Sequence, residues 1–305
     1  MKPSVSLGLL LGLIGVTLFG GTVPATRYAV QWLDPAFLTF GRATLAGIVA
    51  GGLLLIRGAT PPWRRGIPFT DILVVAACLI FGFPLLMAYG SLTVPSSHAG
   101  VVLGILPLAT TLAATVLSGE RPSLPFFAIS CFGCALVVTF ALRNGGAGDF
   151  GLGDVYLGLS AVICAIGYAV SGRLSRSMPG WEVIAWALVV ALVVTAPAAL
   201  WMAPKDLTLV PASAWGAMAY VAFISQFFAF FFWNAGLAMG GIARVGQLQL
   251  LQTFLIVVLS WPINGEAPDP ETYLFMLAVM AVVAIGQSAK VKMAPPVQEG
   301  RAGGA

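Results

Sequence analysis

Most of the polar side chains that could bind a ligand in this sequence lie inside long apolar segments. Gln249 and Gln252 are three residues apart and fall on one face of a helix, while Gln226 and Asn234 lie together in another apolar segment. An amide both donates and accepts hydrogen bonds, so these side chains could bind a polar group of a ligand. They could equally bond a neighbouring helix, and both interpretations also hold for Thr22.

Aromatic and basic side chains in further apolar segments could complete such a site. Tyr89, Tyr168 and Trp186 come from three different segments, and an aromatic ring can stack on an aromatic ligand or receive an ammonium group over its face. Arg42 could anchor a substrate carboxylate, or its side chain could extend toward a membrane face and helix ends. His98 could titrate near neutral pH or serve only to line the outer mouth of its segment. We treat all of these as candidate substrate-binding residues.

The sequence offers little for catalysis or metal binding. His98 is the only histidine, and Cys131 and Cys134, although spaced as CxxC, lie in an apolar run without neighbouring carboxylates. No Walker A motif is present. We therefore predict that the chain is not an enzyme and needs no metal or cofactor. Because none of its eleven carboxylates is placed at mid-membrane depth, facilitated movement down a gradient is favoured over proton or sodium coupling.

The composition requires that lipid surround most of these side chains. Of 305 residues, 59% are hydrophobic and 9% are charged, whereas a soluble domain carries about 25% charged residues. A helix needs about 20 apolar residues to cross the bilayer, and the apolar runs are too long and uniform for the strands of a barrel. The predicted fold is an all-α integral membrane protein with spans at about 7–30, 35–56, 70–90, 97–117, 124–142, 153–173, 181–202, 213–237, 245–262 and 271–289.

The distribution of basic residues predicts the orientation of the chain. With a cytoplasmic N-terminus, eleven Lys and Arg residues lie inside, three lie outside, and Arg42 lies within a span. Cytoplasmic segments carry the excess of positive charge, so both termini are predicted to be cytoplasmic. The net charge of +4 is explained by this topology and by anionic lipid at the inner face, and no nucleic-acid partner is predicted.

Two similar turns indicate an internal repeat. Gly-Glu-Arg-Pro at 119–122 and Gly-Glu-Ala-Pro at 265–268 are 146 residues apart, and at the same offset Gly100 matches Gly246. An accidental match is the alternative. A five-helix unit has an odd number of spans, so the second unit must enter the membrane from the opposite side, which puts Glu120 at the cytoplasmic face and Glu266 at the outer face. We predict inverted repeats at 1–146 and 147–289, followed by a disordered cytoplasmic tail at 290–305. Small residues let helices approach and separate, so Gly100 and Gly246 are expected at a gate.

A family resemblance rests on the residues at these positions. Arg42 within Pro-Ala-Phe-Leu-Thr-Phe-Gly-Arg-Ala, Tyr89-Gly90, Pro107 within Ile-Leu-Pro-Leu, and the two Gly-Glu turns are similar to those of EamA-type ten-helix exporters of the drug/metabolite transporter superfamily. Within that family the chain resembles the YddG-type aromatic amino-acid exporters, through Ser-His-Ala-Gly at 97–100 and the Phe-rich eighth span that leads to Gln-Leu-Gln at 247–249. One departure is that Thr253 stands where the position of Pro107 predicts a second proline.

The resemblance implies a carrier of the bacterial inner membrane. We expect it to export small amphipathic metabolites, foremost aromatic and other apolar amino acids, by alternating access. Export of another metabolite or of a drug-like cation coupled to protons, or a passive pore, remain alternatives. The expected partners are the substrate and the lipid bilayer. A monomer would suffice, and the oligomeric state is left open.

Overall fold

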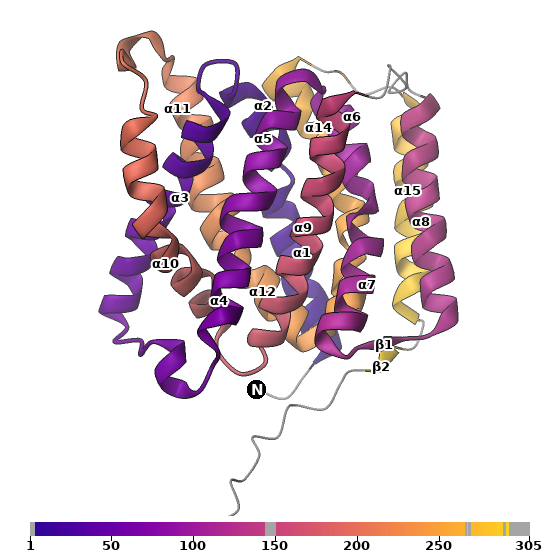
Figure 1. Cartoon of the computed structure of the whole chain (residues 1–305). Helices are drawn as coiled ribbons and strands as arrows, with labels where there is room; N and C mark the ends of the chain where they lie inside the picture. Colours follow the sequence, from indigo (N-terminus) through magenta and orange to yellow (C-terminus); the bar gives the residue numbers. More distant parts are fainter. Residues whose placement is uncertain (1–3, 144–150, 266, 268–269, 289–290, 293–305) are drawn as a thin grey trace, which may run out of the picture.

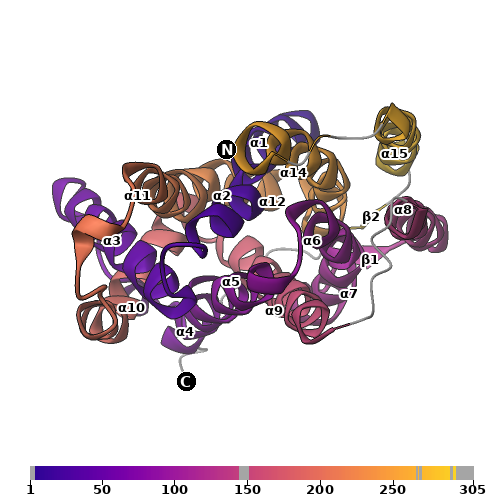
Figure 2. The ribbon, with the colours of Figure 1, turned by 90° about the horizontal axis from the view of Figure 1, so that it is seen from above.

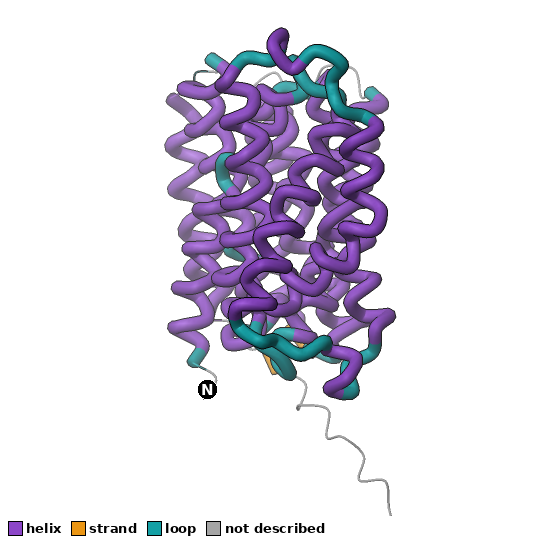
Figure 3. Tube along the Cα trace, turned by 90° about the vertical axis from the view of Figure 1, so that its left-hand side faces the viewer, coloured by secondary structure: helices purple, strands orange, loops and turns teal. Residues whose placement is uncertain are grey.

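The computed structural model describes residues 4–143, 151–265, 267, 270–288 and 291–292. Helices that run side by side make up nearly all of it (Figures 1 and 3). Eight helices in this part of the chain are long and apolar enough to cross a membrane. Two shorter apolar stretches, Leu124–Leu136 and Tyr273–Gly286, lie in the fifth and tenth predicted spans, so the predicted all-α membrane fold is confirmed.

The first half of the bundle contains five spans, three of which are interrupted. The first span consists of α1 (Val5–Phe19) and α2 (Thr22–Ala29), and the second is α3 (Pro35–Ile56). The third combines α4 (Phe69–Val75), the π-helical segment η2 (Ala76–Gly82) and α5 (Phe83–Thr93). The fourth combines α6 (Ser96–Val102), the 3₁₀ turn η3 (Leu103–Ile105) and α7 (Leu106–Ser118), and the fifth is α8 (Leu124–Arg143). A further 3₁₀ turn, η1 (Pro62–Arg65), precedes α4.

The second half repeats this plan. Its spans are α9 (Leu152–Leu174), α10 (Gly180–Trp201), then α11 (Ala212–Ala219) with the π-helical segment η5 (Tyr220–Phe228) and α12 (Ala229–Gly240). Next come α13 (Ile242–Gly246) with α14 (Gln249–Asn264), and finally α15 (Pro270–Ser288). The 3₁₀ turn η4 (Leu207–Leu209) lies before α11. Both ends of each of these spans lie within three residues of the ends predicted from hydropathy.

The fourth and ninth spans begin and end at corresponding positions of the predicted repeat. The fourth span begins at Ser96 and ends at Ser118, and the ninth begins at Ile242 and ends at Asn264, so both ends are separated by the 146 residues found in the sequence. Gly119 and Gly265 follow these helices with φ angles of +65° and +76°. Only glycine adopts this left-handed conformation without strain, which explains the glycine in both turns.

Contacts at the helix ends establish that the second half is inverted. At one end of the bundle Glu120, directly after the fourth span, accepts hydrogen bonds from the backbone of Ile242, where the ninth span begins. At the other end Asn264, where the ninth span ends, donates to Ser96, where the fourth begins. The two spans are therefore antiparallel. The boundary at 146/147 and Glu266 lie outside the described residues.

Glycines bring the first and eighth spans into close contact. A Cβ atom added to Gly8 would lie 2.4 Å from the backbone nitrogen of Gly240, and one added to Gly236 would lie 2.7 Å from that of Gly12. Such an approach is possible only without side chains. Helix α3 packs against α10 at one edge of the bundle and α8 against α15 at the opposite edge (Figure 2).

Both described ends of the chain lie at the same end of the bundle (Figure 1). There β1 (Arg121–Pro122) pairs antiparallel with β2 (Val291–Lys292), with Arg121 opposite Lys292. The tail at 290–305 was expected to be disordered, but its residues Val291 and Lys292 form this short ladder because the turn after the fourth span offers them backbone partners. The rest of the tail lies outside the described residues.

Candidate functional site

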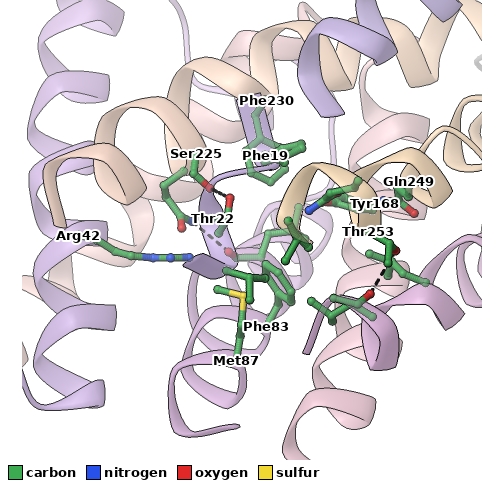
Figure 4. A pocket seen from close by; sticks show the side chains of 18 residues that line it. Phe19, Thr22, Arg42, Phe83, Met87, Tyr168, Ser225, Phe230, Gln249 and Thr253 are labelled. Carbon is green, nitrogen blue, oxygen red and sulfur yellow. Dashed lines mark hydrogen bonds between the residues drawn. The ribbon is translucent and has the colours of Figure 1, made fainter. Parts of the chain in front are cut away.

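A pocket lies between the two halves, among the interrupted helices (Figure 4). Seven of the residues singled out from the sequence line it: Thr22, Arg42, Gly100, Tyr168, Gln226, Gln249 and Gln252. The centre of a water-sized sphere can occupy only about 20 Å³ of the pocket, which is room for one or two water molecules. The pocket as the structure has it is therefore too small for a ligand of amino-acid size.

Irregular helix geometry faces this pocket from both halves. The π-helical segments η2 and η5 occupy corresponding parts of the third and eighth spans, and a π-helical stretch frees backbone carbonyls from the α-helical pattern. The amide nitrogen of Gln226, in η5, donates to the carbonyl oxygen of Leu79, in η2, at 3.0 Å. Interrupted helices of this kind surround the binding sites of many transporters.

Matched positions of the two repeats give the pocket an apolar and a polar wall. Where the first half places a leucine, the second half places a polar side chain 146 residues later. The three matched pairs are Leu79 with Ser225, Leu103 with Gln249, and Leu106 with Gln252. The site is therefore amphipathic, with most of its hydrogen-bonding groups on the second half.

Two amides of the polar wall have hydrogen-bonding capacity that the described residues leave unused. Gln249 accepts a long hydrogen bond of 3.5 Å from Thr110, but its buried Nε2 has no partner among these residues, and neither has Oε1 of Gln252. Buried polar groups are normally hydrogen-bonded. Oε1 of Gln252 is thus available to a ligand, whereas the amide of Gln249 also lies beside the Tyr168 hydroxyl. Gln226 differs, because its donor is already used by the bond to Leu79.

Other polar groups of the pocket already bond each other. The hydroxyl groups of Thr22 and Ser225 are 2.8 Å apart and join the first and eighth spans. Thr253 donates to the carbonyl oxygen of Gly100 at 3.1 Å. Thr253 replaces the proline expected in the ninth span, and its hydroxyl forms a link between the fourth and ninth spans that proline could not form.

An aromatic cluster closes one side of the pocket. Phe19 and Phe230 meet edge to face with ring centroids 5.1 Å apart, and Tyr168 lies 6.1 Å from Phe230. Behind them the fully buried Trp233 packs on Tyr168 at 5.2 Å. The rings come from the first, sixth and eighth spans, so both halves contribute to this surface.

Arg42 extends into the pocket rather than toward a membrane face (Figure 4). It lies seven residues into α3, about 10 Å along the helix axis, and only 3% of it is exposed. No hydrogen bond or ion pair to its guanidinium occurs within the described part of the chain, and its buried Nε is without a partner there. The interpretation that the side chain extends to the membrane surface is therefore not supported.

Two aromatic candidates lie away from the pocket. Tyr89 is 37% exposed and packs on Tyr156 at a centroid distance of 6.2 Å. Trp186 packs on Trp63, outside the bundle core, at 5.4 Å. Tyr89 is close to the end of its span, four residues before the end of α5, whereas Trp186 lies six residues into α10 but is not among the lining residues of the pocket. The structure does not bring them together with Tyr168.

The remaining polar candidates are used by contacts between helices. Asn234 accepts from Ser171 at 2.8 Å and donates to the carbonyl oxygen of Gly180 at 3.0 Å, so its amide joins the sixth, seventh and eighth spans. His98 lies 2.7 Å from Asp154 at the end of the bundle opposite the N-terminus. Neither side chain lines the pocket.

Gly100 and Gly246 occupy equivalent contacts between the fourth and ninth spans. A Cβ atom on Gly100 would lie 3.1 Å from Ile256, and one on Gly246 would lie 3.0 Å from Thr110. Ile256 and Thr110 are themselves 146 residues apart, so each half presents a glycine to the same position of the other. This reciprocity is what two inverted repeats produce across their common axis.

Charged networks close the end of the bundle where the N-terminus lies. Glu120 is fully buried, forms an ion pair with Arg176, and accepts hydrogen bonds from the backbone nitrogens of Ile242 and Ala243 at 2.8 Å each. At the same end Arg173 pairs with Asp71, and Arg65 with Glu182. We found no cluster of three or more metal-ligating side chains within the described ranges.

The comparisons with known proteins agree with this geometry. The EamA-like transporter family matches residues 6–142 and again residues 151–286, one match for each half. The "Uncharacterized transporter YdeK" of Bacillus subtilis is 44% identical over 277 residues, which cover 91% of this chain and 96% of that protein. The "Probable terminal-alkyne amino-acid exporter" of Streptantibioticus cattleyicolor is 24% identical over 84% of either chain.

A solved structure has the same fold. A crystal structure with 23% sequence identity superposes with a TM-score of 0.72 and covers 93% of this chain and 99% of its own. The repeated family match is consistent with two five-helix halves. The chain is a multi-pass membrane protein that belongs to the EamA-like transporter family.

Proposed function

We propose that the protein is a secondary carrier that exports small amphipathic metabolites, foremost aromatic and other apolar amino acids, across the bacterial inner membrane. The observation that carries this proposal is the amphipathic pocket between the repeats, which is lined by aromatic rings and by amides with unpartnered atoms. A molecule with an apolar side chain and a polar head matches both kinds of lining residue. The name of the relative from S. cattleyicolor, an amino-acid exporter, supports the same substrate class.

Tyr168, Phe19 and Phe230 are proposed to bind the apolar part of the substrate. Stacked or edge-to-face aromatic contacts contribute about 0.5–1.5 kcal/mol beyond burial, and the amides of Gln249 and Gln252 add neutral hydrogen bonds of about 1 kcal/mol each. These contributions are modest. We therefore expect weak affinity and broad specificity, as an exporter that must release its substrate requires.

The proposed mechanism is alternating access through exchange of conformation between the halves. Inverted repeats can adopt each other's conformation, which opens the pocket to one side and then to the other. The small pocket and the glycine contacts of Gly100 and Gly246 support a gate formed by the fourth and ninth spans. Since no carboxylate is among the residues that line the described pocket, we propose uncoupled, facilitated transport.

Reconstitution of the purified chain in liposomes tests the proposal. Vesicles loaded with single amino acids should release tryptophan, phenylalanine and leucine with rates that saturate with concentration. Linear, non-saturating release would indicate a passive pore, and dependence on an imposed pH gradient would indicate proton coupling. Release of none of the amino acids by a correctly folded protein would contradict the proposed substrate class.

We further propose that both termini are cytoplasmic, on the charge distribution of the loops. A reporter that is active only outside the cytoplasm should be silent when fused to the C-terminus. Activity of that fusion would contradict the orientation while leaving the fold intact.

A further inference from the structure

Arg42 is a buried cation for which the described protein supplies no anion. It is the only Lys or Arg in the described part of the chain that is fully buried, at 3% exposure. Its side chain lines the pocket and points toward the hydroxyl pair of Thr22 and Ser225 (Figure 4). Its Nε is buried without a partner, and no described side chain pairs with its guanidinium.

A guanidinium remains ionised in a protein, and burying an unpaired charge is costly. The carboxylates whose side chains the structure describes cannot meet that charge, because each lies at a helix end with its own partner. Asp34 and Asp206 accept from backbone nitrogens at helix starts, and the others pair with basic side chains: Glu120 with Arg176, Asp71 with Arg173, Glu182 with Arg65, and Asp154 with His98.

We propose that Arg42 binds the carboxylate of the transported molecule, and that the carrier therefore selects carboxylates over cations. This inference rests on the proposed function and names the group by which the pocket selects its substrate. The planar guanidinium can bind a carboxylate through two parallel hydrogen bonds. A bound carboxylate also pairs with Arg42, so the guanidinium is no longer an unpaired charge in the loaded pocket.

The orientation of the substrate follows from the position of Arg42. The guanidinium enters from α3, whereas Phe19, Phe230 and Tyr168 lie beyond the Thr22–Ser225 pair (Figure 4). An amino acid would therefore place its carboxylate toward α3 and its side chain toward the rings. A cationic drug in the same pocket would meet Arg42 without a compensating anion.

Three probes that share a phenylethyl skeleton separate the contributions of the charged groups. L-Phenylalanine carries both charges, 3-phenylpropionate lacks the ammonium group, and phenethylamine lacks the carboxylate. Thermal stability of the purified full chain is measured against concentration of each probe, together with the variants Arg42→Gln and Arg42→Lys. Arg57→Gln is the matched control, because Arg57 follows the same helix, α3, but is exposed at its end.

We expect L-phenylalanine and 3-phenylpropionate to stabilise the wild-type chain and phenethylamine to do so at least about tenfold more weakly. The free-energy cost of losing one partner of a buried charge pair is large enough to account for a tenfold difference in binding. Arg42→Gln should weaken binding of both carboxylates at least about tenfold, Arg42→Lys should retain part of it, and Arg57→Gln should leave it unchanged.

The proposal is overturned if phenethylamine binds as well as 3-phenylpropionate, if neither carboxylate stabilises the protein, or if Arg42→Gln binds both carboxylates as the wild type does. If Arg42→Gln does not fold, the three probes on the wild type decide alone. Carboxylate binding that depends on Arg42, without transport of any amino acid in liposomes, would refute the proposed function and leave this inference standing. Amino-acid transport that is unchanged in Arg42→Gln would refute this inference and leave the proposed function standing.

Discussion

Replacement of Glu120 by glutamine should make the end of the bundle where the N-terminus lies open more readily. The carboxylate of Glu120 is fully buried and connects three segments of the chain. It follows the fourth span, accepts from the first backbone nitrogens of the ninth span at Ile242 and Ala243, and pairs with Arg176 between the sixth and seventh spans. In the alternating-access mechanism these contacts must break each time this end opens.

The size of the effect follows from these contacts. A hydrogen bond to a charged group contributes about 1.5–3 kcal/mol, and removal of one partner from a buried ion pair costs about 3–5 kcal/mol. Glutamine keeps one acceptor oxygen but turns its amide nitrogen, a donor, toward a second backbone donor. We therefore expect Glu120→Gln to lower the free energy of local opening by about 3 kcal/mol, which is about a hundredfold in the opening equilibrium.

Hydrogen exchange measures this opening directly. The amides of Ile242 and Ala243 exchange only when they leave the carboxylate, so a peptide that covers 242–246 should exchange about a hundredfold faster in Glu120→Gln. Glu182→Gln is the matched control at the same end. The side chains of this pair are 34% exposed for Arg65 and 10% for Glu182, against 18% and 0% for Arg176 and Glu120. Solvent therefore screens the Arg65–Glu182 pair more, and we expect a smaller effect.

Unchanged exchange of 242–246 in Glu120→Gln would refute the inference that the contacts of Glu120 hold this end closed. Equal acceleration in Glu182→Gln would show that loss of charge at this end, rather than the cap on the ninth span, is responsible. Faster exchange throughout the chain would indicate general unfolding, and the effect could then not be ascribed to a gate.

Three further predictions follow from the packing and the pocket. Gly8→Ala should destabilise the protein by about 1–3 kcal/mol, because its Cβ would meet a backbone nitrogen of α12 at 2.4 Å, whereas Gly158→Ala, with nothing within 4 Å, should leave the melting temperature unchanged. Tyr168→Ala should raise the half-saturating concentration for phenylalanine more than for threonine, and Tyr89→Ala should change neither; an unchanged ratio in Tyr168→Ala would exclude ring stacking in the pocket. Gly100→Leu should abolish transport while membrane insertion is retained, and full flux at normal expression would contradict a gate at this position.

The fold could be predicted from the sequence because the bilayer constrains it strongly. Each span must be about 20 apolar residues long, and the lengths of the hydrophobic runs therefore locate the spans that the structure describes. The repeat could also be found, because a glycine with positive φ is required after both Ser118 and Asn264. Interruptions within the spans, such as η2 and η5, could not be predicted, since their residues are as apolar as the regular helices on either side.

The candidate site was only partly predictable. Gln226, Gln249 and Gln252 stood out because amides are costly in lipid, and all three line the pocket. Phe19 was not predicted as a lining residue, and Phe230 could not be separated from the other phenylalanines of the eighth span. The sequence alone does not distinguish a ring that faces a pocket from one that faces lipid. The repeat offered one further signal, since Tyr168 lies 146 residues after Thr22 and both line the pocket.

Tyr89 and Trp186 were selected by residue type without regard to depth. Tyr89 lies four residues before the end of its helix, about 6 Å along the axis, and is thus close to the surface of the bilayer. The number of residues between Tyr89 and the end of the apolar run could already be counted in the sequence. The contact between Tyr89 and Tyr156 depends on how the third span packs against the sixth. The pattern of apolar residues around both helices does not determine that packing.

Counterflow in liposomes tests the central claim most directly, namely that one pocket between the inverted halves faces the two sides of the membrane in turn. Vesicles that contain the purified chain are loaded with a high concentration of unlabelled phenylalanine and diluted into a trace of labelled phenylalanine. A carrier with a single alternating pocket should accumulate the label transiently above its external concentration, and Gln249→Ala or Tyr168→Ala should diminish this overshoot. Equilibration of the label without an overshoot, at a rate independent of the internal phenylalanine, would contradict the account and favour a passive pore.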